Sequence, residues 1–351
     1  MWIKASGTSL RTLQAEQMVQ LERSALNQIW DAAYPEDPDA REAAALSDLL
    51  AARSPNQGNL RPSVETMMHA LFPHTFVLHT HPTVVNGLTC GIAGAQVFQR
   101  LFTDRGVWIP TMNPGFVLSR YIQQAVERWR AAHDGVWPQI LLLQNHGLVV
   151  AANSVAEIHQ LQEDVLTAVE KEITSRPTME PILQGPAHLE ELRDSVTEGV
   201  ATFLAAHGQP LTPPHTIAFT LSELEDRMGN TETINELTAA LSPDHIVYSG
   251  HKPCIIQPTA RIPHGEIIEG IMNYCHEEET CPKIVIVDTY GAFAVGSTPK
   301  KAHLAQLLFL DALAVHHYAT SFGGAQGMPE DQVSFIRNWE VEAFREQAST
   351  A

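Results

Sequence analysis

The feature of this sequence that most constrains its fold is a pair of short apolar runs joined by a tight turn. Ile140–Leu143 and Leu148–Ala151 contain only aliphatic residues and alanine, and Asn145-His146-Gly147 lies between them. Apolar runs of this length on either side of a turn signal predict two buried strands. His146 is therefore expected at the edge of a buried sheet.

Helical and strand patterns alternate through residues 1–205. Phe76–His81 is expected to be a strand that Pro82 ends. The expected helices of this half are Asp39–Ala52, Ser63–Phe72, 83–101, 114–133 and Ser154 to about Ser175, the last with Glu157 at the capping-box position.

The proline-rich stretch Gly208–Pro214 predicts a boundary between two domains, 1–207 and 214–351. Beyond this boundary we expect strands near 215–220, 244–248, 283–288 and 291–295, and helices near 298–320 and 330–348.

The second half is expected to repeat the first. Pro73–His81 aligns with Pro243–His251, and Asn145–Val150 aligns with Thr289–Ala294. In that alignment Glu65 becomes Asn235, His79 becomes Ser249 and His146 becomes Tyr290, so the second copy would keep the scaffold and lose any metal. The similarity is weak at each position, and the alternative is that the two halves are unrelated.

Composition limits the classes of protein that fit. Hydrophobic residues make up 44% of the chain and charged residues 18%, as in globular proteins. No run reaches the roughly 18 apolar residues of a membrane span, and no signal peptide is visible. The formal net charge of −18 disfavours nucleic acid as a partner, although a metal ion and loop amides could still bind a small anion. The four cysteines form no CxxC pair, so we expect reduced thiols and a cytoplasmic protein.

Histidines are the strongest candidates for chemistry. His79 and His81 are separated by one residue on an expected strand, so both side chains project from one face and can hold one ion. His146 is the best third ligand because it follows a buried strand and precedes a glycine, and three protein ligands leave room for substrate. The alternative is a pair of polar residues on a solvated strand face. His69 and His74 are weaker candidate ligands.

Glu65 begins the helix that leads into this strand. A carboxylate there could reach the metal and remove a proton that the metal has made acidic. The alternative is an ordinary acid in the first turn of a helix, where it interacts with the helix dipole. Ser6, Gly7 and Ser63 lie in expected loops near helix starts and are candidate phosphate ligands, because hydroxyls and amides at such positions bind anions.

Taken together, these residues resemble the class II aldolase/adducin family, whose metal-dependent members include fuculose- and rhamnulose-phosphate aldolases. The matching segments are Lys4–Thr8, Arg61–Glu65 with His69, Val77–Pro82 and Asn145–Val150, and their order and spacing cover residues 1 to about 175. Asp244–Tyr248 and Asn338–Glu342 resemble the long members of the family, which carry a second, related domain.

The resemblance implies an α/β fold with three α/β/α layers around a mixed, largely antiparallel sheet, and a second, degenerate α/β domain of similar type. It also implies zinc, or another divalent metal, bound by His79, His81 and His146, with Glu65 as the acid–base residue. In the family's aldolases the metal binds the carbonyl and neighbouring hydroxyl of a dihydroxyacetone-phosphate unit and stabilises the enediolate that forms when the carbon–carbon bond breaks. A homo-oligomer is expected by the same analogy.

Two departures from the family pattern bear on activity. The family has a further strand and a turn containing glycine and asparagine before the segment that matches Lys4–Thr8, and that turn helps to bind phosphate. The family's aldolases also use a tyrosine as proton donor to the aldehyde at a position where this chain has Thr111.

The first functional hypothesis is therefore an aldolase that cleaves a ketose phosphate or deoxy-ketose phosphate to a three-carbon ketone phosphate and an aldehyde. Epimerases, dehydratases and decarboxylases of the family use the same metal triad. Two further alternatives are a non-catalytic, adducin-like scaffold, which the three histidines and Glu65 disfavour, and a truncated, inactive chain.

Overall fold

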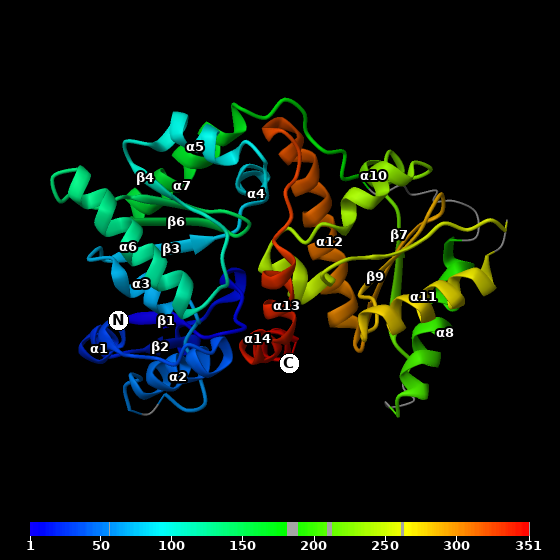
Figure 1. Ribbon diagram of the computed structural model, residues 1–351, viewed down its shortest axis with the longest axis horizontal. Coiled ribbons are helices and arrows are strands. Elements are labelled where there is room, and N and C mark those ends of the chain that lie inside the picture. Colours follow the sequence, from blue (N-terminus) through cyan, green and yellow to red (C-terminus); the bar gives the residue numbers. More distant parts are fainter. Residues whose placement is uncertain (56, 181–188, 209–212, 261–262, 351) are drawn as a thin grey trace. The chain divides into compact units, whose positions relative to one another are not determined.

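The computed structural model describes residues 1–55, 57–180, 189–208, 213–260 and 263–350 (Figure 1). The chain divides into two compact units, and each unit contains a sheet of its own. The first unit comprises Met1–Val85, Gly94–Lys171 and Glu330–Ala351, and the second comprises Asn86–Ala93 and Glu172–Pro329.

The first unit is built around a four-stranded sheet of order β3-β6-β5-β4 (Figure 1). β3 (Phe76–Thr80) and β5 (Ile140–Leu143) run antiparallel to β6 (Gly147–Ala152), and β4 (Gly106–Ile109) runs parallel to β5. β3, β4 and β5 therefore end at the same edge of the sheet, where the following loops can bring side chains together.

Helices cover both faces of this sheet. α3 (Thr66–Leu71) and α6 (Phe116–Ala132) pack on one face, against a core that contains Leu141 and Val149. Side chains alternate along a strand, and the residues that point to the other face are also buried. α7 (Val155–Glu170) packs against β3 and β6 on that other face. The expected α/β/α layers around a mixed, largely antiparallel sheet are confirmed.

Side-chain caps, one local and one from a distant segment, account for where the two long helices of this unit begin. At α7, Ser154 Oγ accepts from the Glu157 amide at 3.2 Å, and the Glu157 carboxylate accepts from the Ser154 amide at 3.1 Å, which is the predicted capping box. At α6, the buried carboxylate of Glu42 accepts from the Phe116 amide at 2.9 Å. Polar groups at both helix starts are therefore satisfied by side chains.

The remaining α-helices and strands that precede α7 in the chain lie outside the two four-stranded sheets. They are β1 (Trp2–Lys4), β2 (Met18–Gln20), α1 (Arg23–Asp31), α2 (Pro38–Ala51), α4 (Thr83–Thr89) and α5 (Gly94–Phe102). β1 and β2 pair antiparallel as a two-stranded sheet.

The second unit has a four-stranded sheet of order β7-β10-β9-β8. β7 (His215–Phe219) and β9 (Ile284–Val287) run antiparallel to β10 (Gly291–Gly296), and β8 (Cys254–Ile256) runs parallel to β9. Strand order and directions thus repeat those of the first unit. The expected second α/β domain of similar type is confirmed.

Helices also cover both faces of the second sheet. α8 (Leu189–Ala206) and α11 (His264–Glu278) pack side by side on one face (Figure 1), and α12 (Pro299–Ala319) packs on the other.

The turn between β9 and β10 matches the turn between β5 and β6 in detail. Asn145 has a φ of 56° and Thr289 a φ of 69°, so both turns pass through the left-handed region. The amides of His146 and Tyr290 each donate to the carbonyl of the last residue in the preceding strand, at 3.1 and 3.0 Å. The predicted match of 145–150 with 289–294 is confirmed.

The predicted match for the strand that contains His79 is wrong, because the expected strand near 244–248 is a π-helix, His245–Ser249, packed against α12. A run of three apolar residues cannot by itself distinguish strand from helix. Register identifies the true counterpart: His79 pairs with Val149, and Ala218 pairs with Phe293.

Corrected in this way, the second copy has different residues at the candidate ligand positions. His79 corresponds to Ala218 rather than Ser249, and His81 corresponds to Thr220 rather than His251. Asn235, the predicted counterpart of Glu65, lies in α10 (Thr231–Asn235), which follows β7 instead of preceding it.

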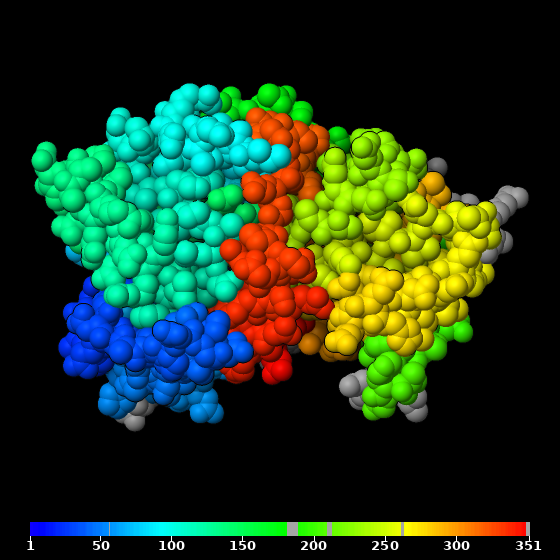
Figure 2. Space-filling view, in the orientation of Figure 1, coloured from blue at the N-terminus to red at the C-terminus, as the bar shows by residue number. Residues whose placement is uncertain are grey.

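The two units differ from the expected domains 1–207 and 214–351. α8 belongs to the second unit because it packs on α11, whereas α13 (Glu330–Asn338) and α14 (Glu340–Thr350) belong to the first. Figure 2 shows these C-terminal residues in red against the N-terminal residues in blue. Of the expected boundary at Gly208–Pro214, residues 209–212 lie outside the described part of the chain.

Three expected helices also differ in extent. The helix expected at 83–101 is interrupted between α4 and α5, and the helix expected at 330–348 is interrupted at Trp339. The helix expected from Ser63 begins at Thr66, and Ser63 does not cap it. Among the described residues, no helix is both long and apolar enough to span a bilayer.

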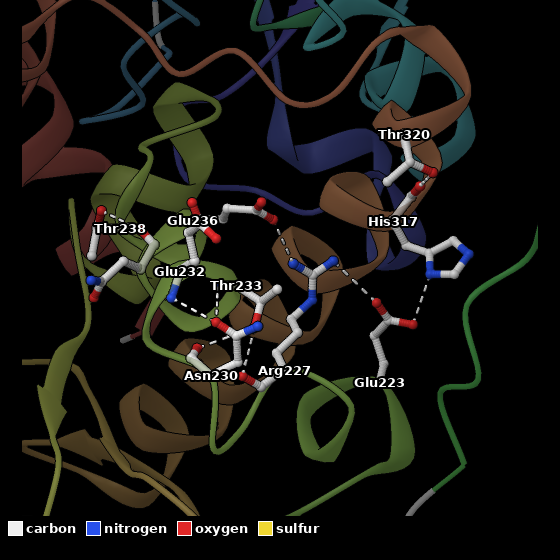
Figure 3. A network of polar contacts seen from close by, with 10 residues as sticks. Glu223, Arg227, Asn230, Glu232, Thr233, Glu236, Thr238, His317 and Thr320 are labelled. Atoms are coloured by element: carbon white, nitrogen blue, oxygen red, sulfur yellow. Dashed lines mark hydrogen bonds and ion pairs between the residues drawn. The ribbon is translucent and has the colours of Figure 1, made fainter.

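A polar network in the second unit ties α9 (Ser222–Glu225) to α12 (Figure 3). Glu223 accepts from His317 Nδ1 at 2.8 Å and from Arg227 Nη2 at 3.3 Å, and Arg227 Nη1 donates to Glu236 at 3.2 Å. These partners balance the charge of a carboxylate that is only 5% exposed.

His316, next to this network, makes stability depend on pH. The side chain is 4% exposed, and burial, assisted by Arg227, lowers the pKa of His316 to about 3. The unfolded chain, in which a histidine has a pKa of about 6.5, binds the proton more readily, so stability is lost as pH falls from about 6.5. We expect about 2 kcal/mol of loss from His316 at pH 5 relative to pH 7.

Urea unfolding of the metal-free protein at pH 7 and pH 5 measures this effect. In His316→Gln, the free energy of unfolding should differ less between pH 7 and pH 5, because the titrating group is gone. An unchanged difference would show that other groups cause the acid sensitivity.

Candidate metal centre

Four predicted residues, Glu65, His79, His81 and His146, come together in the first unit. One donor atom from each lies within 4.8 Å of the others, and no other such group occurs among the described residues. His79 is on β3 and His81 follows it, His146 is in the turn between β5 and β6, and Glu65 immediately precedes α3. Three separate segments therefore supply the cluster.

The distances within the cluster suit one small cation. His79 Nε2 lies 3.0 Å from His81 Nε2 and 3.4 Å from His146 Nε2. Glu65 Oε1 lies 3.1 Å from His79 Nε2 and 3.4 Å from His146 Nε2. Tetrahedral zinc with bonds of about 2.0–2.1 Å holds its ligand atoms about 3.3–3.4 Å apart. The three histidine nitrogens and the Glu65 oxygen are thus close enough to one another to surround one small cation.

Hydrogen bonding determines which nitrogen of His79 faces the cluster with a lone pair. His79 Nδ1 lies 2.9 Å from the carbonyl oxygen of Leu148, and because a carbonyl only accepts, Nδ1 carries the proton. In the neutral ring Nε2 is then unprotonated, and it faces two further imidazoles and a carboxylate. Lone pairs that face one another in this way repel unless a proton or a cation lies among them. A histidine that donates one ring N–H to a carbonyl and presents the other nitrogen to the cluster has the arrangement of a metal-binding histidine.

Burial keeps the site ready to bind a cation. It lowers the pKa of His146 to about 4 although Glu65 opposes the shift, so the ring is neutral near pH 7. Burial by itself would raise the pKa of Glu65, but His79 and His146 outweigh it and hold that pKa well below its usual value. Neutral imidazoles and an ionised carboxylate are the forms that bind metal.

Gly147 lets the histidine rings approach the turn. A Cβ at this position would lie 2.5 Å from His81 Cδ2 and 2.6 Å from the carbonyl oxygen of Thr80. A side chain therefore cannot be accommodated without moving the strand end that carries two of the four donors.

The three candidate phosphate residues lie beside one another, near Glu65. Ser63 Oγ lies 3.3 Å from Glu65 Oε2, and the Ser6 amide donates to the Arg61 carbonyl at 2.8 Å. Gly7 follows with a φ of 80° in the turn after β1. Their phosphate-binding role stays a prediction.

The weaker candidates are not in the cluster. The His69 ring centre is 6.5 Å from that of His79, and burial lowers the pKa of His69 to about 4. His74 packs near Phe72. Thr111, at the position where a tyrosine was expected, donates from Oγ1 to Gln332 Oε1 at 2.9 Å.

Sequence reasoning missed the Leu148 carbonyl, which fixes the proton of His79, because backbone partners leave no residue-type signal. It also assigned no role to Arg61, although Arg61 lies in the same motif as Ser63 and Glu65. Arg61 and Ser63 are two residues apart in an extended segment that contains a proline, and this spacing could have indicated that they share a face.

The corresponding place in the second unit is filled by an apolar side chain. A Cβ on Gly291, the counterpart of Gly147, would lie 2.8 Å from Leu189 Cδ1 and 3.0 Å from the carbonyl oxygen of Phe219. Leu189 from α8 thus lies where His81 lies in the first unit.

Known proteins resemble this chain in two ways. The family model described as "Class II Aldolase and Adducin N-terminal domain" matches residues 1–172. A Bacillus subtilis (strain 168) protein named "Uncharacterized oxidoreductase YuxG" is 22% identical over 372 residues, which cover 98% of this chain and 52% of that protein. The chain therefore spans about half the length of this relative.

A solved structure of the N-terminal class II aldolase domain of a conserved protein from Thermoplasma acidophilum is also similar. It shares 22% identity with a TM-score of 0.39, and the match covers 48% of this chain and 72% of that one.

Loss of one imidazole should empty the site. We expect His146→Ala to weaken zinc binding more than about 100-fold, since changes to outer-shell partners alone cost 10–100-fold. His251→Ala is the control, because His251 binds Glu278 at 2.6 Å and lies outside the cluster. Metal analysis after dialysis measures both, and equal loss in the two variants would contradict the assignment.

Close packing at the turn gives a second prediction. Gly147→Ala should weaken zinc binding by about 10–100-fold, because the added methyl displaces the ends of β3. Gly265→Ala is the matched control, since a Cβ there has nothing within 4 Å. Unchanged zinc affinity in Gly147→Ala would show that zinc binding does not depend on the close contact between His81 and the turn at Gly147.

Proposed function

Because residues 1–172 belong to the class II aldolase and adducin family, we propose that this chain is a divalent-metal-dependent aldolase. It cleaves a ketose phosphate or deoxy-ketose phosphate to a three-carbon ketone phosphate and an aldehyde. The observation that carries the proposal is the cluster of three imidazoles with a carboxylate at 3.1 Å from one of them.

The donor set suits zinc, which prefers nitrogen and carboxylate ligands in a four-coordinate site. His79, His81 and His146 would hold the ion and leave one position for substrate. Bound zinc would supply a fixed positive charge where negative charge develops on the substrate carbonyl.

Glu65 acts as the acid–base residue. Its carboxylate is ionised and lies within reach of the metal position, but its side chain remains 18% exposed. In the condensation direction the ionised carboxylate removes a proton from the carbon next to the carbonyl. Cleavage is the reverse: the carboxylic acid form of Glu65 returns a proton to that carbon, and the proton lost by the hydroxyl of the cleaved bond passes to solvent. Ser63 Oγ at 3.3 Å orients the carboxylate.

Ser6, Gly7 and Ser63 bind the phosphate of the substrate. Support comes from the pairing of the Ser6 segment with the Arg61–Ser63 segment, which places hydroxyls and a turn of positive φ next to Glu65. A cytoplasmic location and a homo-oligomeric state remain part of the proposal; none of the four cysteines, all within the described residues, forms a disulfide, which suits the former.

Other enzyme activities and a scaffold role are alternatives to this function. An epimerase or dehydratase of the same family would use the same cluster, and the products of the reaction distinguish these from an aldolase. An adducin-like scaffold would not need four converging donor groups. The name of the Bacillus subtilis relative contains the word oxidoreductase, but that protein is about twice as long as this chain, and the name does not say which part of it has that activity.

Replacing the base should separate binding from turnover. We expect Glu65→Gln to keep zinc but to lower kcat about 10²–10⁴-fold, the usual contribution of a general base. The kcat of aldol cleavage is measured on a panel of ketose phosphates by monitoring the release of the three-carbon ketone phosphate. Full activity in Glu65→Gln would place the base elsewhere.

Glu163→Gln is the control for this prediction. Glu163 is an exposed residue of α7, and the substitution changes the charge by the same amount without touching the cluster. Both zinc content and kcat should be unchanged.

A further inference from the structure

Arg61 lies in an extended segment that faces the candidate metal centre. Ala5 and Pro62 form an antiparallel bridge, flanked by hydrogen bonds from the Ser6 amide to the Arg61 carbonyl and from the Ser63 amide to the Lys4 carbonyl. Side chains alternate along such a segment, so those of Arg61 and Ser63 project from the same face.

That shared face is the one that carries the chemistry. Ser63 Oγ contacts Glu65, and Glu65 contacts His79 and His146. Arg61 therefore projects from the same face of the segment as Ser63, which contacts Glu65.

The guanidinium of Arg61 is held by the C-terminal helix. It lies over the Phe344 ring, 4.0 Å from the ring centre, and it makes two parallel contacts with Glu340, at 3.0 Å from Nη1 and 3.1 Å from Nη2. The Arg61 side chain is 16% exposed, whereas the Glu340 side chain is 69% exposed. The stacked arginine is thus fixed, and its carboxylate partner is in contact with solvent.

We propose that Arg61 binds the phosphate group of the substrate and that Glu340 occupies this position until the substrate displaces it. The inference rests on the proposed function, to which it adds a charged residue that binds the phosphate together with Ser6, Gly7 and Ser63. Glu340 then acts as an internal competitor supplied by the last helix of the chain.

The chemistry of the pair favours a phosphate monoester. A guanidinium binds a phosphate through the same two parallel hydrogen bonds that it makes with a carboxylate. A phosphate dianion carries more charge than Glu340 and can replace it. In a chain with a formal net charge of −18, a fixed cation on the same face as Ser63 also favours the approach of an anion.

Binding of inorganic phosphate to the zinc-loaded, full-length chain tests the proposal by calorimetry. Arg61→Gln should weaken phosphate binding at least tenfold. Glu340→Gln should strengthen it about two- to fivefold, because it removes a competitor held by a solvent-exposed ion pair. The gain from Glu340→Gln should vanish in the double variant with Arg61→Gln, since the two residues act through one contact.

Asp164→Asn is the matched control. Asp164 pairs with Arg105 at 3.1 Å in the same unit, so the substitution breaks an arginine–carboxylate pair and changes the charge by the same amount. Phosphate affinity should not change. If Arg61→Gln also loses zinc, its weaker phosphate binding has two explanations. Glu340→Gln leaves Arg61 in place, so its phosphate affinity then decides whether Glu340 competes with phosphate for Arg61.

Three outcomes would overturn the proposal: phosphate affinity unchanged in Glu340→Gln, a gain that persists in the double variant, or an equal gain in Asp164→Asn. Failure of the proposed function is separately visible, because phosphate affinity is measured without turnover. If no ketose phosphate is cleaved but the affinities change as expected, the anion site stands and the aldolase proposal fails.

Discussion

Four Lewis-basic atoms that all lie within 4.8 Å of one another, with four of their separations at 3.0–3.4 Å, are the constraint on which the first unit depends. With Nδ1 of His79 committed to a backbone carbonyl, its Nε2 has only a lone pair to offer. A bound cation would relieve the repulsion within the cluster, and the surrounding burial would make that relief larger than it would be in water. The sheet holds the histidines close together because β3, which carries His79, and β5, which precedes His146, both pair with β6.

The second unit shows that the scaffold does not require the metal. Strand order, strand directions and the left-handed turn residue all recur, yet the ligand positions hold Ala218, Thr220 and Tyr290. Leu189 fills the space of an imidazole, so the lost donors are replaced by apolar packing. Stability of the layered fold comes from burial of the sheet between helices, which both copies retain.

The last residues of the chain return to the first unit and reach its candidate substrate side. Gln332 pairs with Thr111, which follows β4 at the same sheet edge as the metal cluster, and Glu340 pairs with Arg61. Trp339 is buried beside Gly115, where α6 begins. The segment that completes the first unit is therefore encoded after the whole of the second.

By itself, the sequence predicted six of the eight strands in the two four-stranded sheets, the starts of helices such as α7 and the four residues that meet in the cluster, but it missed β4, β8, α8 and α11. Apolar runs such as Ile140–Leu143, the capping residue Ser154 and the one-residue spacing of His79 and His81 act locally, so they can be recognised without coordinates. Only the tertiary structure decided that Ile246–Tyr248 is helical, that β7 is the true counterpart of β3, and that residues 330–350 join the first unit. Each of these depends on which distant surface a segment buries against, and short-range periodicity carries no information about that choice.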